Sequence, residues 1–146
     1  MPRIKIQLPE QFNFSTEIPI RISDLNYGGH VGNDTVLTLI HEARVQFLRS
    51  HQYTELDIEG VSLIMGDAAL EFKAESFYGD SIRIFVAAGD FSRVGFDLYY
   101  KLVRTNDDAI IATGKTGMVC FNYSTRKVVS VPEPVPSKFS SFLRLE

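Results

Sequence analysis

The chain is organised around Arg21-Ile22-Ser23-Asp24-Leu25-Asn26-Tyr27-Gly28-Gly29-His30-Val31-Gly32-Asn33-Asp34, a polar segment between a strand pattern and an apolar helix pattern. Upstream, Ile18, Ile20 and Ile22 alternate with residues unsuited to a core, which predicts a strand with one buried face. Three glycines in the segment permit tight turns and close approach of the backbone to a ligand. Asn33 is placed to cap a helix, and Asp34 in the first turn suits the helix dipole. The segment therefore predicts a helix amino terminus presented by a polar loop.

The helix is expected to run from this cap to about Ser50. Its apolar side chains form one stripe and also spread onto other faces; they are Val36, Leu37, Leu39, Ile40, Ala43, Val45, Phe47 and Leu48. A helix that is apolar on several faces is typical of a core position. We therefore expect neighbouring elements to cover most sides of this helix.

Strand patterns follow the helix. A polar connection leads to four alternating runs separated by tight turns, over residues 62–77, 82–89, 96–102 and 109–123. The order of strand, long helix and four further strands predicts an α+β fold, an antiparallel sheet that curls around one long central helix. Such a sheet leaves exposed edges, which are usually paired, so a homo-oligomer is expected.

The expected sheet has two irregularities, and the chain end has its own pattern. The alternation breaks at Ala68-Ala69 and at Ile110-Ile111-Ala112, which predicts β-bulges or close strand contacts there. Prolines at positions 132, 134 and 136 predict an extended tail, and residues 138–145 then favour a short helix or a loose segment.

At 146 residues and 16.5 kDa, the chain has the length of one domain, residues 1–146. The first ten residues lack the apolar core of a secretion signal, and no apolar run approaches the roughly 20 residues of a membrane span. A cytoplasmic protein without a membrane span is therefore expected.

A net charge of −3 with scattered cations argues against a nucleic-acid partner. The single cysteine, Cys120, falls in a strand pattern and is expected to be a buried small hydrophobe.

The loop carries most of the candidate chemistry. Within eleven positions it places five polar side chains, those of Asp24, Asn26, His30, Asn33 and Asp34. Two interpretations stand: a binding or catalytic site, or a set of helix caps and Asx-turns. No metal or cofactor is expected, because the histidines and the cysteine show no paired ligand spacing and the glycines do not form a phosphate-binding motif.

A second candidate is Glu42 on the helix. It shares a helix face with Thr38, Gln46 and Arg49, so the face is either solvated or part of an interface. The alternative is that Glu42 is a carboxylate acting in catalysis.

These residues resemble the hotdog-fold acyl-CoA thioesterases, the 4-hydroxybenzoyl-CoA thioesterase-like superfamily. The matching pattern is Arg-x-x-Asp-x-Asp-x-x-Gly-His-Val-x-Asn, read here from Arg21 to Asn33 and continued by Glu42-Ala43-Arg44. Further family-like segments are Glu75-Ser76-Phe77-Tyr78-Gly79-Asp80-Ser81-Ile82 and Ala112-Thr113-Gly114. The resemblance covers nearly the whole chain. It implies a hotdog fold, a homodimer or homotetramer, and acyl-thioester sites between subunits.

The sequence departs from the family pattern at one position. One branch of the family carries a catalytic aspartate in the loop, and the matching residue here is Asn26. Asparagine cannot act as a base or nucleophile, although it can orient water or a carbonyl group. In another branch the carboxylate lies on the central helix, where Glu42 looks equivalent. The resemblance thus implies catalytic candidates Glu42, Asn26, Asp24 and His30, and substrate-binding residues Gly32, Asn33 and Asp34.

Hydrolysis of an acyl-CoA or acyl-carrier thioester is the first functional hypothesis. A carboxylate would activate water or attack the carbonyl carbon, while backbone amides at the helix start polarise the thioester oxygen. Eight or nine helical residues span about 12 to 14 Å, so Glu42 is predicted to act on the site of the partner subunit. The structural alternative is an ion pair between Glu42 and Arg44 or Arg49, with Asp24 or Asp34 carrying the chemistry.

Two other functions stay open from the sequence. The first is a non-catalytic hotdog protein that binds acyl-CoA or an acyl carrier, favoured by Asn26 in place of the family aspartate. The second is a hydratase or dehydratase on the same fold, which would need a histidine and a carboxylate facing each other across the site.

Overall fold

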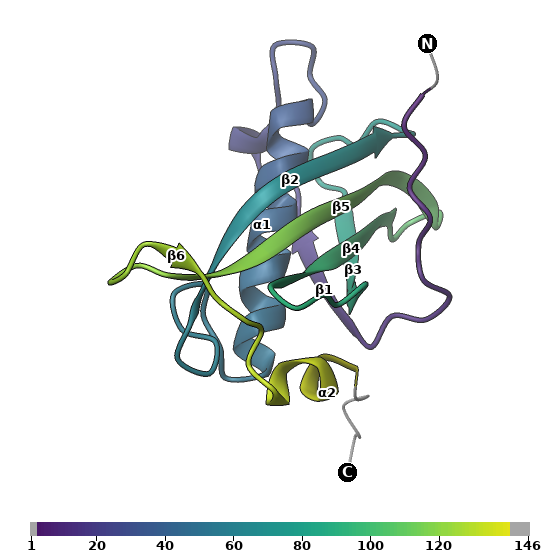
Figure 1. The fold of residues 1–146 in the computed structure, drawn as a ribbon. Coiled ribbons are helices and arrows are strands. Elements are labelled where there is room, and N and C mark those ends of the chain that lie inside the picture. Colours follow the sequence, from purple (N-terminus) through teal and green to yellow (C-terminus); the bar gives the residue numbers. More distant parts are fainter. Residues whose placement is uncertain (1–2, 141–146) are drawn as a thin grey trace.

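The computed structural model describes residues 3–140, which contain one six-stranded antiparallel sheet and one long helix. The elements follow in the order β1 (Phe14–Pro19), η1 (Ile22–Asp24), α1 (Asn33–Ser50), β2 (Ser62–Phe72), β3 (Ser81–Gly89), β4 (Gly95–Arg104), β5 (Ala109–Asn122), β6 (Lys127–Val128) and α2 (Pro134–Ser140). The sheet order is β1-β3-β4-β5-β2, and β6 pairs with β5. Figure 1 shows the strands crossing α1 obliquely while the sheet curls around it. The predicted α+β architecture is confirmed.

The core lies between α1 and the concave face of the sheet. The helix stripe predicted from the sequence, including Ile40, Ala43 and Phe47, is fully buried against it. The strands supply their alternate residues, such as Ile84 in β3 and Leu98 in β4, because successive strand side chains point to opposite faces. The opposite face of α1 is open within one chain. The expectation that neighbours cover most sides of α1 is therefore met only on the sheet side.

The first strand lies earlier than predicted. β1 ends at Pro19, and Ile22 falls in the 3₁₀ turn η1 with its side chain 72% exposed. The chain leaves the sheet here because the Asp24 carboxylate accepts the backbone N–H of Arg21, which folds this segment into a turn. The inward positions of β1 are Phe14 and Ile18, both packed on the core.

The start of the long helix is shifted by one residue from the prediction. Asn33 is the first helical residue, and the N-cap is Gly32, which has an extended backbone and no capping side chain. A side chain at position 32 would crowd the loop, since a Cβ there would lie 2.6 Å from Oδ1 of Asp34. Asp34 does lie in the first turn, as the helix dipole favours.

The second strand ends at Phe72, five residues before the predicted end, and the chain then leaves the sheet. The bulge predicted in β5 is confirmed, because Leu102 pairs with Ala112 and Val103 with Ile110, which leaves Ile111 as the extra residue. The bulge in β2 lies at Gly66, two residues before the predicted place.

The carboxyl-terminal segment folds back onto the end of α1 (Figure 1). α2 begins at Pro134, earlier than expected; proline suits the first turn of a helix, where its missing N–H has no partner to lose. Phe139 is buried and packs against Phe47 at 4.9 Å and His51 at 5.0 Å between ring centroids. Residues 141–145 of the predicted terminal segment lie outside the described residues.

Gly95 at the start of β4 is expected to be intolerant of any side chain. A Cβ at this position would lie 2.3 Å from the backbone oxygen of Met118 in the paired strand, which cannot move freely. We expect Gly95→Ala to lower the free energy of unfolding by about 1–3 kcal/mol, the usual range for overpacking. Urea denaturation measures this change. The matched control is Gly89→Ala, whose Cβ would meet only the Tyr99 ring at 3.5 Å; equal losses in both variants would contradict the steric explanation.

Cys120 is buried, as predicted, and burial raises the pKa of its thiol to about 11. Because the thiolate is the reactive form, native protein should be almost unreactive toward an aromatic disulfide reagent at pH 8. One thiol per chain should become reactive after unfolding in urea. An absorbance time course measures both rates, and rapid labelling of the native protein would contradict the burial.

Candidate active site

The loop before α1 is a short hairpin held by its own backbone. The N–H of Asn26 donates to the carbonyl of His30 at 2.8 Å, and the N–H of Gly29 donates to the carbonyl of Asn26 at 3.1 Å. Gly29 has φ +81°, a conformation that favours glycine. Tyr27 at the tip is fully exposed. The closed loop fixes His30 and Val31 immediately before the helix start.

The side chain of Asn26 belongs to this loop structure. Its Oδ1 accepts the N–H of Gly28 at 2.8 Å, forming an Asx-turn. Asn26 also lies against the helix cap, since a Cβ at Gly32 would be 3.5 Å from the Cβ of Asn26. Asn26 is therefore next to the helix start, as the family pattern implies, and one of its side-chain atoms already has a structural partner.

The side chain of Asp24 is buried at the start of the loop. Its carboxylate accepts the N–H of Arg21 at 2.8 Å and lies 3.5 Å from the guanidinium of the same residue. These contacts hold the η1 turn, and Asp24 does not line the pocket described below.

His30 has a defined orientation. Its Nδ1 lies 3.1 Å from the carbonyl oxygen of Val31, which can only accept, so Nδ1 carries the proton in this contact. In the neutral ring Nε2 then has a free lone pair. His30 is half-buried and contributes to the wall of a pocket at the start of α1.

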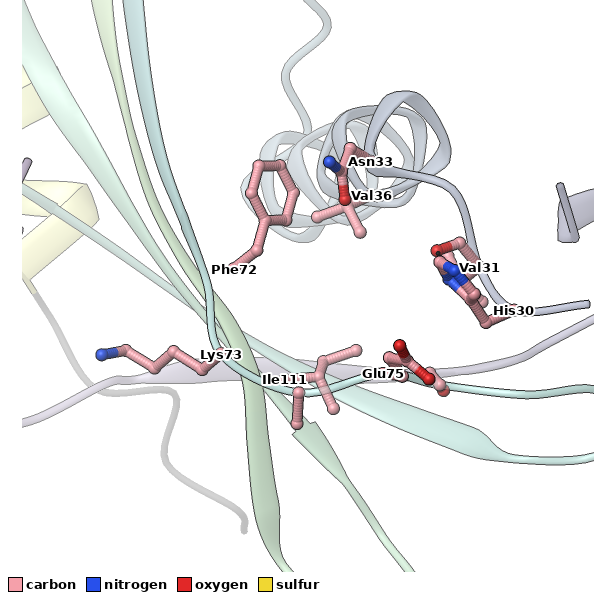
Figure 2. A pocket seen from close by; sticks show the side chains of 10 residues that line it. His30, Val31, Asn33, Val36, Phe72, Lys73, Glu75 and Ile111 are labelled. Atoms are coloured by element: carbon pink, nitrogen blue, oxygen red, sulfur yellow. Dashed lines mark hydrogen bonds between the residues drawn. The ribbon is translucent and has the colours of Figure 1, made fainter. Parts of the chain in front are cut away.

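The pocket has a volume of about 280 Å³ and lies between the loop, the start of α1 and the segment after β2 (Figure 2). It is lined by His30, Val31, Asn33, Val36, Phe72, Lys73, Ala74, Glu75, Ser76 and Ile111. Val36, Phe72 and Ile111 supply an apolar wall, and the polar side chains come from two separate stretches of the chain, residues 30–33 and 73–76. A partly apolar pocket with a few convergent polar groups is the usual form of a small-molecule site.

The segment after β2 is fixed against the loop and against β5. The N–H of Val31 donates to the carbonyl of Ser76 at 2.8 Å, and the N–H of Lys73 donates to the carbonyl of Ile111 at 2.9 Å. The Arg104 guanidinium donates to the carbonyl of Glu75 at 2.6 Å. Lys73, Glu75 and Ser76 were not predicted as site residues. The family-like segment that begins at Glu75 was the sequence signal for Glu75 and Ser76, whereas Lys73 lies before it.

The predicted substrate-binding residues divide between two places. Asn33 lines the pocket, and Gly32 precedes it as the helix cap. Asp34 instead lines a hollow on the open face of α1, together with His41 and Arg44. The backbone amides at the helix start have no partners within the helix, so they form a place of fixed positive potential beside the pocket.

Glu42 lies away from this pocket, on the open face of α1. Its carboxylate accepts a hydrogen bond from Gln46 at 2.8 Å, and Gln46 in turn accepts one from Thr16 of β1. The predicted ion pair is not present: within residues 3–140, Glu42 pairs with neither Arg44 nor Arg49, and Arg44 contacts Glu55 instead. A role for Glu42 at a helix start would require a second subunit, as the helix geometry predicted.

A buried polar network crosses the core beneath the same helix face. The Arg44 guanidinium donates to the hydroxyl of Tyr100 at 3.4 Å, and that hydroxyl lies 2.8 Å from the hydroxyl of Thr116. Nε of Arg44 lies 3.7 Å from the Glu55 carboxylate, too far for a hydrogen bond. Burial raises the pKa of Tyr100, so this phenol stays protonated. The network anchors α1 to the sheet.

Comparison with known proteins identifies the family. Residues 20–139 match the sequence profile of the thioesterase-like superfamily. The chain belongs to this superfamily. The resemblance inferred from the loop and helix is thereby confirmed, and so is the predicted enzyme class, a thioester hydrolase.

Several solved structures share the fold of this chain at low sequence identity. A 1,4-dihydroxy-2-naphthoyl-CoA thioesterase from Synechocystis is 22% identical with a TM-score of 0.79, and the match covers 86% of this chain and 94% of that one. A DHNA-CoA thioesterase from Staphylococcus aureus is 20% identical with a TM-score of 0.74, over 85% and 84% of the two chains. A thioesterase superfamily protein from Jannaschia sp. CCS1 is 20% identical with a TM-score of 0.79, over 90% and 83%. No curated protein matches the chain significantly.

Residues 3–140 contain neither a cluster suited to a metal ion nor a helix suited to a membrane. Among the described residues, no group of three or more histidine, cysteine or acidic side chains is arranged to hold a metal ion. No helix within residues 3–140 is long and apolar enough to cross a membrane.

Proposed function

We propose that the protein hydrolyses acyl-CoA thioesters in the pocket at the start of α1. The observation that carries the proposal is the meeting of three features in one pocket: the helix start at Asn33, the His30 ring, and an apolar wall that includes Phe72. Unpartnered amides at a helix start can stabilise the negative oxygen that forms when a thioester is attacked. The coenzyme A thioesters named for two of the structural relatives support CoA as the carrier.

The proposal includes a site completed by a second subunit. β2 is an edge strand of the sheet, and exposed apolar side chains lie beside the pocket, including Phe72, Phe77 and Tyr78. Exposed edges and apolar patches of this kind are commonly covered by a partner. We therefore expect a homodimer or a homotetramer. Light scattering at micromolar concentration tests this, and a monomer mass would remove the shared site. The cytoplasmic location stays a prediction.

The direct test of the function is a hydrolysis assay across aliphatic and aromatic acyl-CoA thioesters, in which the released thiol is measured. We expect turnover of at least one substrate. Binding of acyl-CoA without thiol release would instead support the second candidate function, an acyl-CoA-binding protein. The observation that favours this alternative is Asn26, which replaces the aspartate of one family branch and makes only a structural hydrogen bond through its oxygen.

The predicted role of Glu42 has its own test, because it would require Glu42 of the partner subunit to act on the pocket. If it does, an inactive Glu42→Gln chain mixed with an inactive Asn26→Ala chain should form mixed dimers with one intact site of the two. Activity should then return on mixing. Failure of activity to return, or full activity of Glu42→Gln alone, would contradict this role.

A further inference from the structure

The loop supplies the pocket with no carboxylate. The residue at the family's aspartate position is Asn26, and Asp24 is engaged with Arg21 outside the pocket. A thioesterase that attacks with water needs a group able to take a proton from that water. Of the ten residues that line the pocket, one is acidic, and that residue is Glu75.

The backbone around Glu75 is held firmly beside His30. The hydrogen bond from Val31 to the carbonyl of Ser76 joins the residue after His30 to the residue after Glu75. The Arg104 guanidinium holds the carbonyl of Glu75 itself at 2.6 Å. Positions 30 and 75 are thus neighbours across this junction, although they are 45 residues apart in the sequence.

The side chain of Glu75 is available for chemistry. Figure 2 shows Glu75 on the same side of the pocket as His30, whereas the Lys73 side chain extends to the other side. Lys73 pairs instead with Glu71 at 3.5 Å. The Arg104 guanidinium is engaged with the Asp107 carboxylate. Within residues 3–140 the Glu75 carboxylate accepts no hydrogen bond and forms no ion pair, so it is free to accept a proton.

We infer that Glu75 is the catalytic base of this protein, acting in the pocket of its own chain in place of the loop carboxylate that Asn26 cannot supply. This inference rests on the proposed hydrolysis of acyl-CoA. Glu75 removes a proton from water as the water oxygen bonds to the thioester carbonyl carbon. The carbonyl oxygen becomes negative and is stabilised at the helix start near Asn33. The carbon–sulfur bond then breaks, and the proton held by Glu75 passes to the departing sulfur, giving the carboxylic acid and free coenzyme A.

The His30 ring also contacts the attacking water in the proposed reaction. Because Nδ1 donates to the Val31 carbonyl, Nε2 of the neutral ring can accept a hydrogen bond from the same water. His30 therefore orients the water, and Glu75 takes its proton. This arrangement needs no carboxylate from the partner subunit.

The test compares the wild-type protein with Glu75→Gln and with Glu133→Gln, an exposed glutamate before α2 that serves as the control. With the best acyl-CoA substrate, Glu75→Gln should lower kcat by about 100-fold or more, the usual contribution of a general base. KM and the thermal unfolding midpoint should change little. Glu133→Gln should keep wild-type kcat.

A second measurement separates a catalytic base from a structural role. Hydroxylamine is a stronger nucleophile than water and does not need a base to attack a thioester. Glu75→Gln should therefore retain most of the hydroxylamine-dependent release of coenzyme A while losing hydrolysis, whereas a distorted pocket would lose both reactions. Equal loss of both reactions, or near-wild-type hydrolysis by Glu75→Gln, would overturn the inference. Hydrolysis lost in Glu42→Gln but kept in Glu75→Gln would overturn it in favour of Glu42, with the proposed function intact. No hydrolysis by the wild type would overturn both.

Discussion

Replacing Asn33 with proline is expected to lower kcat for acyl-CoA hydrolysis by about 100- to 1000-fold while the fold stays intact. Asn33 is the first residue of α1, where proline is well accommodated, and the preceding Gly32 has the extended backbone that a residue before proline requires. The substitution removes one backbone N–H at the helix start. Loss of a single donor to a developing oxyanion typically has an effect of this size.

The matched control is Asn33→Ala, which removes the side chain and keeps the N–H. Its kcat should stay within about tenfold of wild type, since no oxyanion donor is lost. Steady-state kinetics on both variants, with circular dichroism to verify the helix, measures the difference. Similar kcat values for the proline and alanine variants would show that this amide does not bind the thioester oxygen.

The second large effect concerns stability and Arg44. We expect Arg44→Ala to lower the free energy of unfolding by about 3 kcal/mol, because it leaves a cavity beneath α1 and removes the donor that faces Tyr100. Arg44→Met should be nearly neutral. Methionine keeps most of the volume, and the Tyr100 hydroxyl retains Thr116 as a partner. Replacing a buried charge with an apolar side chain of similar size is often neutral or stabilising.

Urea denaturation of both variants distinguishes packing from charge in this network. The Nε atom of Arg44 is buried without a hydrogen bond, which already indicates that the charge is incompletely satisfied. Equal destabilisation by alanine and methionine would contradict this expectation and would assign the stability to the contact between Arg44 and Glu55.

Glu75, the proposed base, was more difficult to single out from the sequence than Glu42. Glu42 was prominent in the sequence because it lies on the long helix and belongs to a family pattern. Its side chain faces outward and is engaged with Gln46. Glu75 lies in a segment without regular structure, and no periodic pattern marks the direction of its side chain. Its place in the pocket follows from two hydrogen bonds between stretches far apart in the chain: the N–H of Val31 donates to the carbonyl of Ser76, and the Arg104 guanidinium donates to the carbonyl of Glu75.

The sequence by itself determined the elements that depend on local patterns. The alternation of Ile82, Ile84 and Val86 predicted β3, and the glycine-rich loop followed by an apolar stripe predicted α1. Both signals arise because strands and helices repeat their side-chain directions over a few residues. The bulge at Ile111 was visible for the same reason, as a break in the alternation.

Tertiary structure alone decided which polar groups share a pocket. Asp24 and His30 are six residues apart, yet one is buried in a turn and the other faces the pocket. His30 and Glu75 are far apart in sequence. They meet because the chain leaves the sheet after Phe72 and the N–H of Val31 then donates to the carbonyl of Ser76. Local patterns encode the period of an element, whereas the meeting of two irregular segments depends on how the whole sheet curls around α1.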